Sequence, residues 1–80
     1  MNASDIQIGL RVRVLTNGMT AVVVGRPEYY TPRAKLVRIK YEQSTRYEHM
    51  INHQLEALPA DEQYEALGGS YTNQEGTFNE

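Results

Sequence analysis

The dipeptide Asn17-Gly18, which stands between two apolar runs, is the feature that most constrains the fold of this chain. A two-residue type I′ turn needs two successive residues at positive φ, and Asn and Gly tolerate that conformation best. The flanking segments 10–16 and 19–25 are rich in valine and long enough to pair. We therefore predict a β-hairpin in which a two-residue loop sets Val14 opposite Ala21.

Alternation along the two predicted strands separates an apolar face from a mixed face. The apolar face is the predicted core side of the hairpin and consists of Leu10, Val12, Val14, Ala21 and Val23. The opposite face carries Arg11 and Arg13 beside Val22 and Val24. Two cations next to two valines indicate a surface that another segment or a partner covers, so these four residues form a secondary candidate binding surface.

Length and composition restrict the chain to one small domain. Eighty residues bury about 60–65% of their unfolded surface, so the core is small. The absence of cysteine excludes disulfides and thiolate metal sites and is compatible with a reducing compartment. No signal-peptide pattern and no apolar run of ~20 residues is present, and we expect a soluble, cytoplasmic protein that does not contact a membrane.

The charges are distributed unevenly along the chain. Residues 1–55 contain all eight Lys and Arg against four acids, a net charge of +4, and residues 56–80 contain six acids and no Lys or Arg, a net charge of −6. A basic body followed by an acidic tail is typical either of a solubilising tail or of a tail that competes with an acidic ligand for the body.

A proline-flanked segment follows the hairpin. Pro27 and Pro32 lie in the stretch 26–33, and each lacks a backbone donor for a central strand. We predict a surface loop there that exposes Tyr29 and Tyr30 between Arg26 and Arg33. These four residues are the main candidate contacts.

Two further strands are predicted at 34–41 and 46–51. In the first, Val37, Ile39 and Tyr41 share one face, and Arg38 and Lys40 share the other. A three-residue loop, 43–45, would pair Tyr41 with Tyr47 and set His49 inward, opposite Ile39. This register places opposite charges outside and an aromatic pair inside, which favours it over its alternatives.

Residues 52–55 have the pattern of one helical turn with Asn52 as its cap, and residues 55–58 that of a short closing strand before Pro59. The chain is therefore predicted to be mainly β: a five-stranded SH3-like barrel, with one helical turn before the last strand and a short C-terminal helix or tail. Residues 8–58 resemble the SH3-like barrels grouped as KOW, Tudor and related domains, on Gly9, Gly18 and the closing segment 55–58.

The resemblance departs from the KOW pattern after the first turn, because residues 19–24 carry no charge. A looser likeness to the plasmid-type dihydrofolate reductase barrel fails at residues 47–50, which lack that family's substrate-contacting motif. The predicted organisation is a lead-in at 1–7, the barrel at 8–59, a short acidic helix at 60–68 that docks on the Val22 and Val24 face or stays free, and a flexible tail at 69–80.

The sequence offers no catalytic or cofactor-binding pattern. It contains no serine elbow, no phosphate-binding loop and no carboxylate pair close to a histidine. His49 and His53 are separated by a predicted strand end, and no third ligand has suitable spacing, so we predict no metal site and no cofactor. We expect a protein that is not an enzyme.

The Arg, Lys and Tyr residues form the most informative set. Our first hypothesis is a regulatory or accessory module that binds another protein, through contacts at Arg26, Tyr29, Tyr30, Arg33, Arg38 and Lys40. The alternative is binding of RNA or single-stranded DNA through the same residues, since cations can track phosphates and aromatic rings can stack on bases. A monomer and a homodimer are compatible with both hypotheses.

Overall fold

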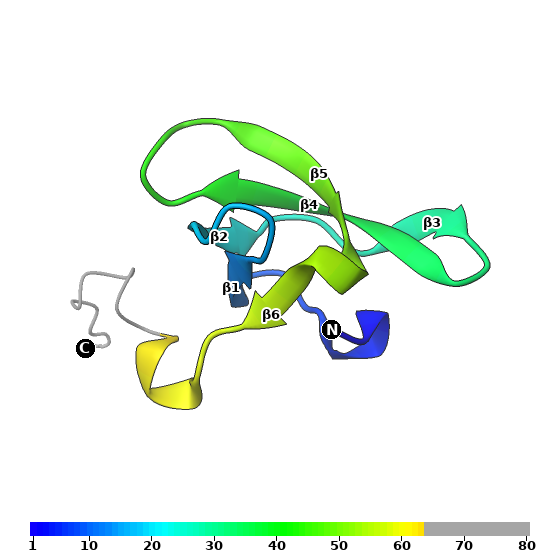
Figure 1. The fold of residues 1–80 in the computed structure, drawn as a ribbon, viewed down its shortest axis with the longest axis horizontal. Coiled ribbons are helices and arrows are strands. Elements are labelled where there is room, and N and C mark those ends of the chain that lie inside the picture. The colour runs from blue at the N-terminus through cyan, green and yellow to red at the C-terminus, as the bar shows by residue number, and fades with distance from the viewer. Residues whose placement is uncertain (64–80) are drawn as a thin grey trace.

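The computed structural model describes residues 1–63, and in this range the chain is mainly β, as predicted (Figure 1). Its six strands are β1 (Arg11–Val14), β2 (Thr20–Val23), β3 (Glu28–Thr31), β4 (Ala34–Tyr41), β5 (Tyr47–Ile51) and β6 (Leu55–Ala57). Its three short 3₁₀ turns are η1 (Ala3–Asp5), η2 (Asn52–Gln54) and η3 (Ala60–Glu62). No helix in residues 1–63 is long and apolar enough to cross a membrane.

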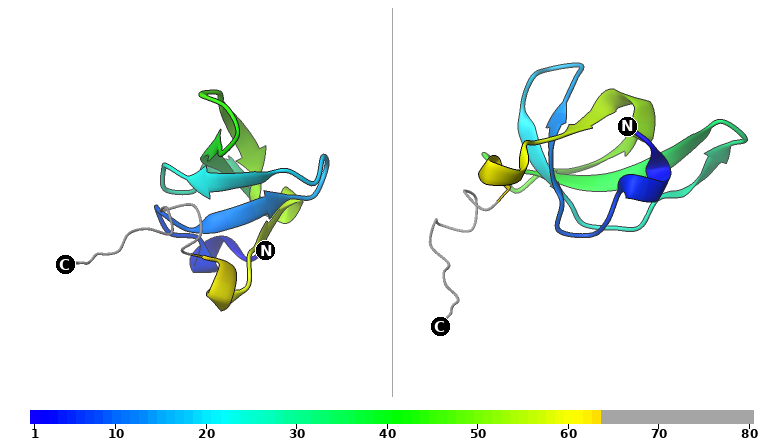
Figure 2. Two further views of the ribbon diagram at one scale, coloured as in Figure 1. Left: turned by 90° about the vertical axis from the view of Figure 1, so that its left-hand side faces the viewer. Right: turned by 90° about the horizontal axis from the view of Figure 1, so that it is seen from below.

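All six strands belong to one antiparallel sheet in the order β3-β4-β2-β1-β6, with β5 on the other edge of β4. The central strand is β4, whose first half pairs with β3 and whose second half pairs with β2. Figure 2 shows that the sheet is strongly curled. The strand pairs within residues 1–63 do not close it into a ring, and the sheet has six strands where the sequence predicted five.

The core lies on the concave face of the sheet. The fully buried side chains alternate along β1, β2 and β4 as the sequence predicted, and Leu55 of β6 joins them; the core cluster consists of Ile6, Val12, Val14, Ala21, Val23, Val37, Ile39, Tyr41 and Leu55. Burial of one large aliphatic side chain contributes about 1.5–3 kcal/mol. The period-two pattern therefore decides which face of each strand is inside.

The first hairpin differs from its predicted register. Val12 pairs with Ala21, and the Val14 N–H donates to the Met19 carbonyl at 2.8 Å, so the loop contains four residues, 15–18. Gly18 adopts a φ of 74° and donates to the Val14 carbonyl at 2.7 Å, while Asn17 Oδ1 accepts the Met19 N–H at 2.9 Å. Each pairing partner is shifted by two residues, which leaves every side chain on its predicted face.

The hairpin of β4 and β5 is shifted by one residue, and the predicted pairing there is wrong. Ile39 lies opposite Glu48, and Arg38 lies opposite His49. Because a shift of one residue reverses the faces, His49 is exposed and is not the core histidine that the sequence predicted. The first three residues of β5 are all exposed, so no burial pattern fixes their register.

Stacked cations and a four-residue loop account for the observed pairing. The Arg38 guanidinium lies 4.7 Å from the centre of the Tyr47 ring, and the Arg46 guanidinium lies 4.8 Å from that of Tyr41. The Tyr41 N–H donates to the Arg46 carbonyl at 3.1 Å across the loop 42–45. Glu42, which the sequence paired with Arg46, is hydrogen-bonded to Arg11 instead.

The segment 26–33, predicted as a loop, contains strand β3. Pro27 immediately precedes this strand and Pro32 immediately follows it. Within residues 1–63, β3 pairs only with β4, so it is an edge strand, a position at which flanking prolines are tolerated.

The helical turn at 52–54 is present, but Asn52 does not cap it. The residue at the N-cap position is Ile51, and Asn52 is a buried polar side chain. Its Oδ1 accepts the Lys35 N–H at 2.9 Å, and its Nδ2 donates to the Met1 carbonyl at 2.7 Å. Asn52 therefore joins β4 to the N-terminal segment.

Both ends of the described chain contain a 3₁₀ turn. In the lead-in, predicted to be irregular, η1 precedes Ile6, which is buried in the core, whereas Ile8 is 60% exposed. Of the acidic helix predicted at 60–68, the structure describes η3 and Gln63. The predicted docking of Tyr64–Leu67 and the predicted tail at 69–80 lie outside the described residues.

We predict that Asn52→Ala destabilises the fold by about 1–3 kcal/mol, because it leaves two partly buried backbone groups without their partner. The measurement is the free energy of unfolding in urea. The matched control is Asn2→Ala, an exposed asparagine without a side-chain cap bond, which should change this free energy by about 0.5 kcal/mol or less. Equal losses in the two variants would contradict the structural role of Asn52.

Candidate binding surfaces

The structure divides the six candidate contact residues between two places. Tyr29, Tyr30 and Arg33 belong to the hairpin of residues 28–36, which we call the arm and which projects away from β1, β2 and β6 (Figure 1). Arg26 lies at the foot of this arm. Arg38 and Lys40 lie further along β4, in the body of the sheet.

The two tyrosines of the arm are among the most exposed large side chains. Tyr29 is 70% exposed and Tyr30 is 54% exposed. Tyr29 pairs with Lys35, whose Nζ lies 5.5 Å from the centre of the tyrosine ring. The register shifts between Tyr29 and Thr31, and such an irregularity redirects a side chain relative to a regular strand. The arm thus presents two aromatic rings that the core does not use.

Hydrogen bonds hold the arm against the body. The Lys35 N–H donates to Asn52, and His53 Nε2 lies 2.9 Å from the Arg33 carbonyl oxygen, to which it donates. Near the tip, Thr31 Oγ1 accepts the Arg33 N–H at 3.2 Å. Arg33 and Lys35 therefore hold the arm to the body, and Thr31 closes its turn.

The second place is the convex side of β2, β4 and β5, which we call the outer face. Side chains on it are cross-strand neighbours: Val22 pairs with Lys40, Lys40 with Tyr47, and Arg38 with His49. The outer face consists of Val22, Val24, Arg38, Lys40, Tyr47 and His49. Val22 and Val24 are half-buried there, whereas Arg38, Tyr47 and His49 are exposed.

Three residues of these surfaces were missed by the sequence reasoning. Tyr47 and His49 were placed inside because the register was wrong by one residue. Lys35 was not singled out, since its contact with Tyr29 depends on β3 being a strand. The signal available in the sequence was the largely polar composition of residues 46–49. Neither face of that strand is clearly hydrophobic, so alternation could not indicate which side chains lie inside.

Arg11, predicted to lie on the secondary surface, is buried. Its Nε and Nη2 donate to the two carboxylate oxygens of Glu42 at 2.6 and 2.7 Å, and the two side chains are only 10% and 13% exposed. Its Nη1 donates to the Glu62 carbonyl oxygen. Gln63 accepts from the Arg11 N–H at 2.9 Å and donates to the Arg11 carbonyl at 3.0 Å. Arg11 is thus a structural residue.

The other cation of that surface, Arg13, is half-buried and pairs across the sheet with Thr20 and Glu56. Its Nη1 donates to the Gly18 carbonyl at 3.1 Å, which links the strand to the first turn. The predicted secondary surface is therefore reduced to the two valines, which join the outer face.

The Arg11 hydrogen bond lowers the pKa of Glu42 below its usual value. Burial opposes this shift, and two smaller effects support it: the 2.7 Å hydrogen bond donated by Thr20 Oγ1 and the positive charge of Arg11. The carboxylate therefore stays ionised in the fold at acidities that would protonate an exposed glutamate.

Within residues 1–63 no three His, Asp or Glu side chains gather in a geometry that could hold a metal ion. Comparison of the chain with protein-family models, with curated proteins and with solved structures finds no match in any of the three. The resemblance to SH3-like barrels therefore stays a prediction from residues 8–58. The function is argued from the two surfaces alone.

We predict that Glu42→Gln lowers the free energy of unfolding at neutral pH by about 1.5–3 kcal/mol, because the buried Arg11 loses its counter-charge. Glu48→Gln is the matched control. It removes an exposed pair in which Arg46 and Glu48 are 3.9 Å apart, and it should cost about 1 kcal/mol or less.

The same variant tests the pKa of Glu42. A lowered pKa in the fold gives stability that is fully present above the unfolded value of about 4.3 and is lost as the pH falls through the folded value. We expect wild type to lose stability on acidification from about pH 5 to pH 2, and Glu42→Gln to lose less over that range. Identical pH profiles in urea unfolding would contradict the assignment.

Proposed function

We propose that this chain is a small, non-catalytic binding module of the SH3-like type, which acts in the cytoplasm on a protein partner as a regulator or accessory subunit. The observation that carries the proposal is the exposure of Tyr29 and Tyr30 on the arm. Tyrosine and arginine are the residues that most often dominate protein interfaces.

The arm has the physical properties of a contact element. Each tyrosine supplies a large contact area while immobilising few rotatable bonds, which limits the entropy lost on binding. The hydrogen bonds that Lys35 makes with Asn52 and Arg33 makes with His53 hold the arm in place before a partner arrives. Such preorganisation raises affinity, because less ordering remains to be done at the moment of binding.

The outer edge of β3 supplies a second mode of contact. Within residues 1–63 this strand pairs on one side only, so the backbone groups of its other side are available to an added strand. An extended peptide of the partner fits there next to the tyrosines. The same edge can pair with a second copy of the chain. The proposal is therefore compatible with a monomer and with a homodimer.

The outer face favours a second candidate function, the binding of single-stranded nucleic acid. Arg38 and Lys40 lie beside Tyr47 on one surface of the sheet, the combination that supports phosphate contacts and base stacking. Against it, the sequence pI of about 5.6 is low for a protein that binds phosphates. We therefore rank this function second.

We predict that Tyr29→Ala/Tyr30→Ala abolishes capture of the partner from a lysate of the source cells, measured by quantitative mass spectrometry against the immobilised wild type. Leu15→Ala/Met19→Ala is the matched control, since it removes two exposed large side chains from the first hairpin, away from the arm. The proposal requires that a protein captured by both the wild type and the control is captured in an amount roughly tenfold lower, or less, by the tyrosine double variant. Recovery of the same proteins by all three would refute it.

The second candidate is tested with a mixed single-stranded oligonucleotide and fluorescence anisotropy. Our first proposal predicts no binding at micromolar protein and low salt. Binding that weakens steeply with salt, that is lost in Arg38→Gln/Lys40→Gln and that is retained in the equally charged Arg26→Gln/Arg33→Gln would replace it with the nucleic-acid function.

A further inference from the structure

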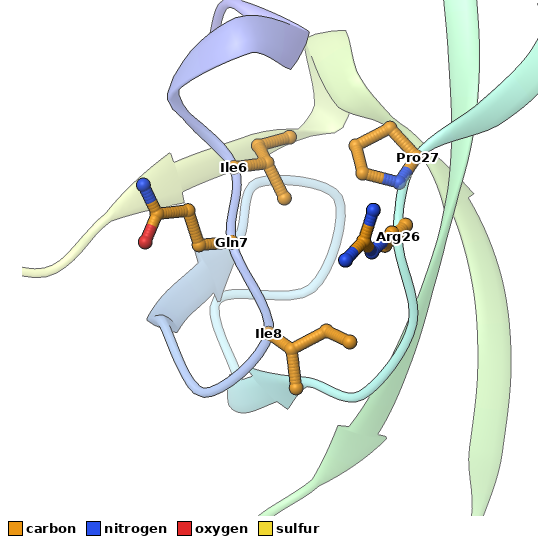
Figure 3. Close-up of a pocket in the computed structure, with 5 residues that line it drawn as sticks. All are labelled: Ile6, Gln7, Ile8, Arg26 and Pro27. Carbon is orange, nitrogen blue, oxygen red and sulfur yellow. The ribbon is translucent and has the colours of Figure 1, made fainter.

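A half-open pocket of ≈ 540 Å³ lies at the foot of the arm, between residues 6–8 and residues 26–27. Figure 3 shows Ile6, Ile8 and Pro27 around the guanidinium of Arg26, with the side chain of Gln7 directed away. Its volume falls in the range of about 300–1,000 Å³ that is typical of ligand sites, and its lining consists of three apolar residues, one cation and one amide.

The cation in this pocket has no partner within the described part of the chain. Arg26 takes part in no hydrogen bond or ion pair in residues 1–63, whose ion pairs join Arg11 to Glu42 and Arg46 to Glu48. A guanidinium presents several N–H donors in one plane, which matches the two oxygens of a carboxylate. Arg26 is therefore available to a carboxylate from outside.

The apolar wall of the pocket is fixed by the fold. Ile6 is buried in the core, and the Leu10 N–H donates to the Gln7 carbonyl at 3.1 Å. Gly9, at a φ of 97°, reverses the chain and donates to the Val23 carbonyl at 2.8 Å. The turn holds Ile8 outward, 60% exposed, beside Arg26.

We propose that this pocket binds an Asp or Glu side chain of the protein partner together with an apolar side chain next to it in the partner's sequence. The carboxylate pairs with Arg26, and the apolar side chain packs on Ile6, Ile8 and Pro27. This inference rests on the proposed function. It assigns to the partner a contact segment that contains an acidic side chain next to a hydrophobic one.

Two features favour such a segment over an inorganic anion. A phosphate dianion prefers several cations, whereas the pocket supplies one, with the apolar side chains of Ile6, Ile8 and Pro27 around it. The pocket is also continuous with the arm, because Arg26 and Pro27 directly precede β3. The pocket and the arm are therefore direct neighbours along the chain.

The test is an NMR titration of the full chain with the capped peptide acetyl-Ala-Leu-Glu-Leu-Ala-amide, followed at the Ile6 and Ile8 methyl groups and at Arg26 Nε–Hε. We expect these signals to shift together. The peptide with Gln in place of Glu should bind roughly tenfold more weakly, because it lacks the charge.

Arg26→Gln should weaken binding of the Glu peptide by the same factor, and Arg33→Gln, an equal charge change at the tip of the arm, should leave it within about twofold. Equal binding of the two peptides, equal losses in both variants, or stronger shifts of the pocket signals with inorganic phosphate would each overturn the proposal.

The experiment separates this proposal from the function on which it rests. Tyr29→Ala/Tyr30→Ala leaves the pocket intact and should bind the Glu peptide as wild type does. If the tyrosine variant loses its protein partner while no peptide enters the pocket, only the pocket proposal fails. If the peptide binds at Arg26 while the tyrosine variant retains its partners, the role of the arm fails.

Discussion

The buried ion pair between Arg11 and Glu42 is the interaction on which the rest of the sheet depends. Removing two charges from water costs several kcal/mol per ion, and only good geometry with further hydrogen bonds offsets that cost. Here the guanidinium reaches both carboxylate oxygens, Thr20 donates to the same carboxylate, and the Glu62 carbonyl accepts from Arg11 Nη1. One side chain thereby connects β1, the end of β4 and the segment after β6.

The sequence predicted the parts of the fold that a period-two pattern controls. Val12, Val23 and Ile39 are buried as the alternation required, and an error of two residues in the first hairpin did not change any face. The register of β5 was predicted wrongly because its first residues have no buried side to fix it. There, stacking of Arg38 on Tyr47 takes the place of burial.

The candidate sites were predicted in part, for reasons that differ from residue to residue. The exposure of Tyr29 and Tyr30 followed from the flanking prolines, although the same prolines concealed an edge strand. The burial of Arg11 depends on Glu42 and Gln63, distant in sequence, and no local pattern reports such contacts. Arg38 and Lys40 are separated from the arm because β4 pairs with β3 only over residues 34–36 and with β2 over residues 39–41. The sequence does not show where this change of partner occurs.

Strand β4 joins the arm to the outer face without a break. Residues 34–36 of this strand form one side of the arm, and residues 39–41 lie in the centre of the sheet. No loop separates the two parts. The strand is hydrogen-bonded to β3 along its first residues and to β2 and β5 beyond them. A partner that pairs with β3 thus lies along the same strand pair that carries Arg38 and Lys40 further on, and no linker separates the two surfaces.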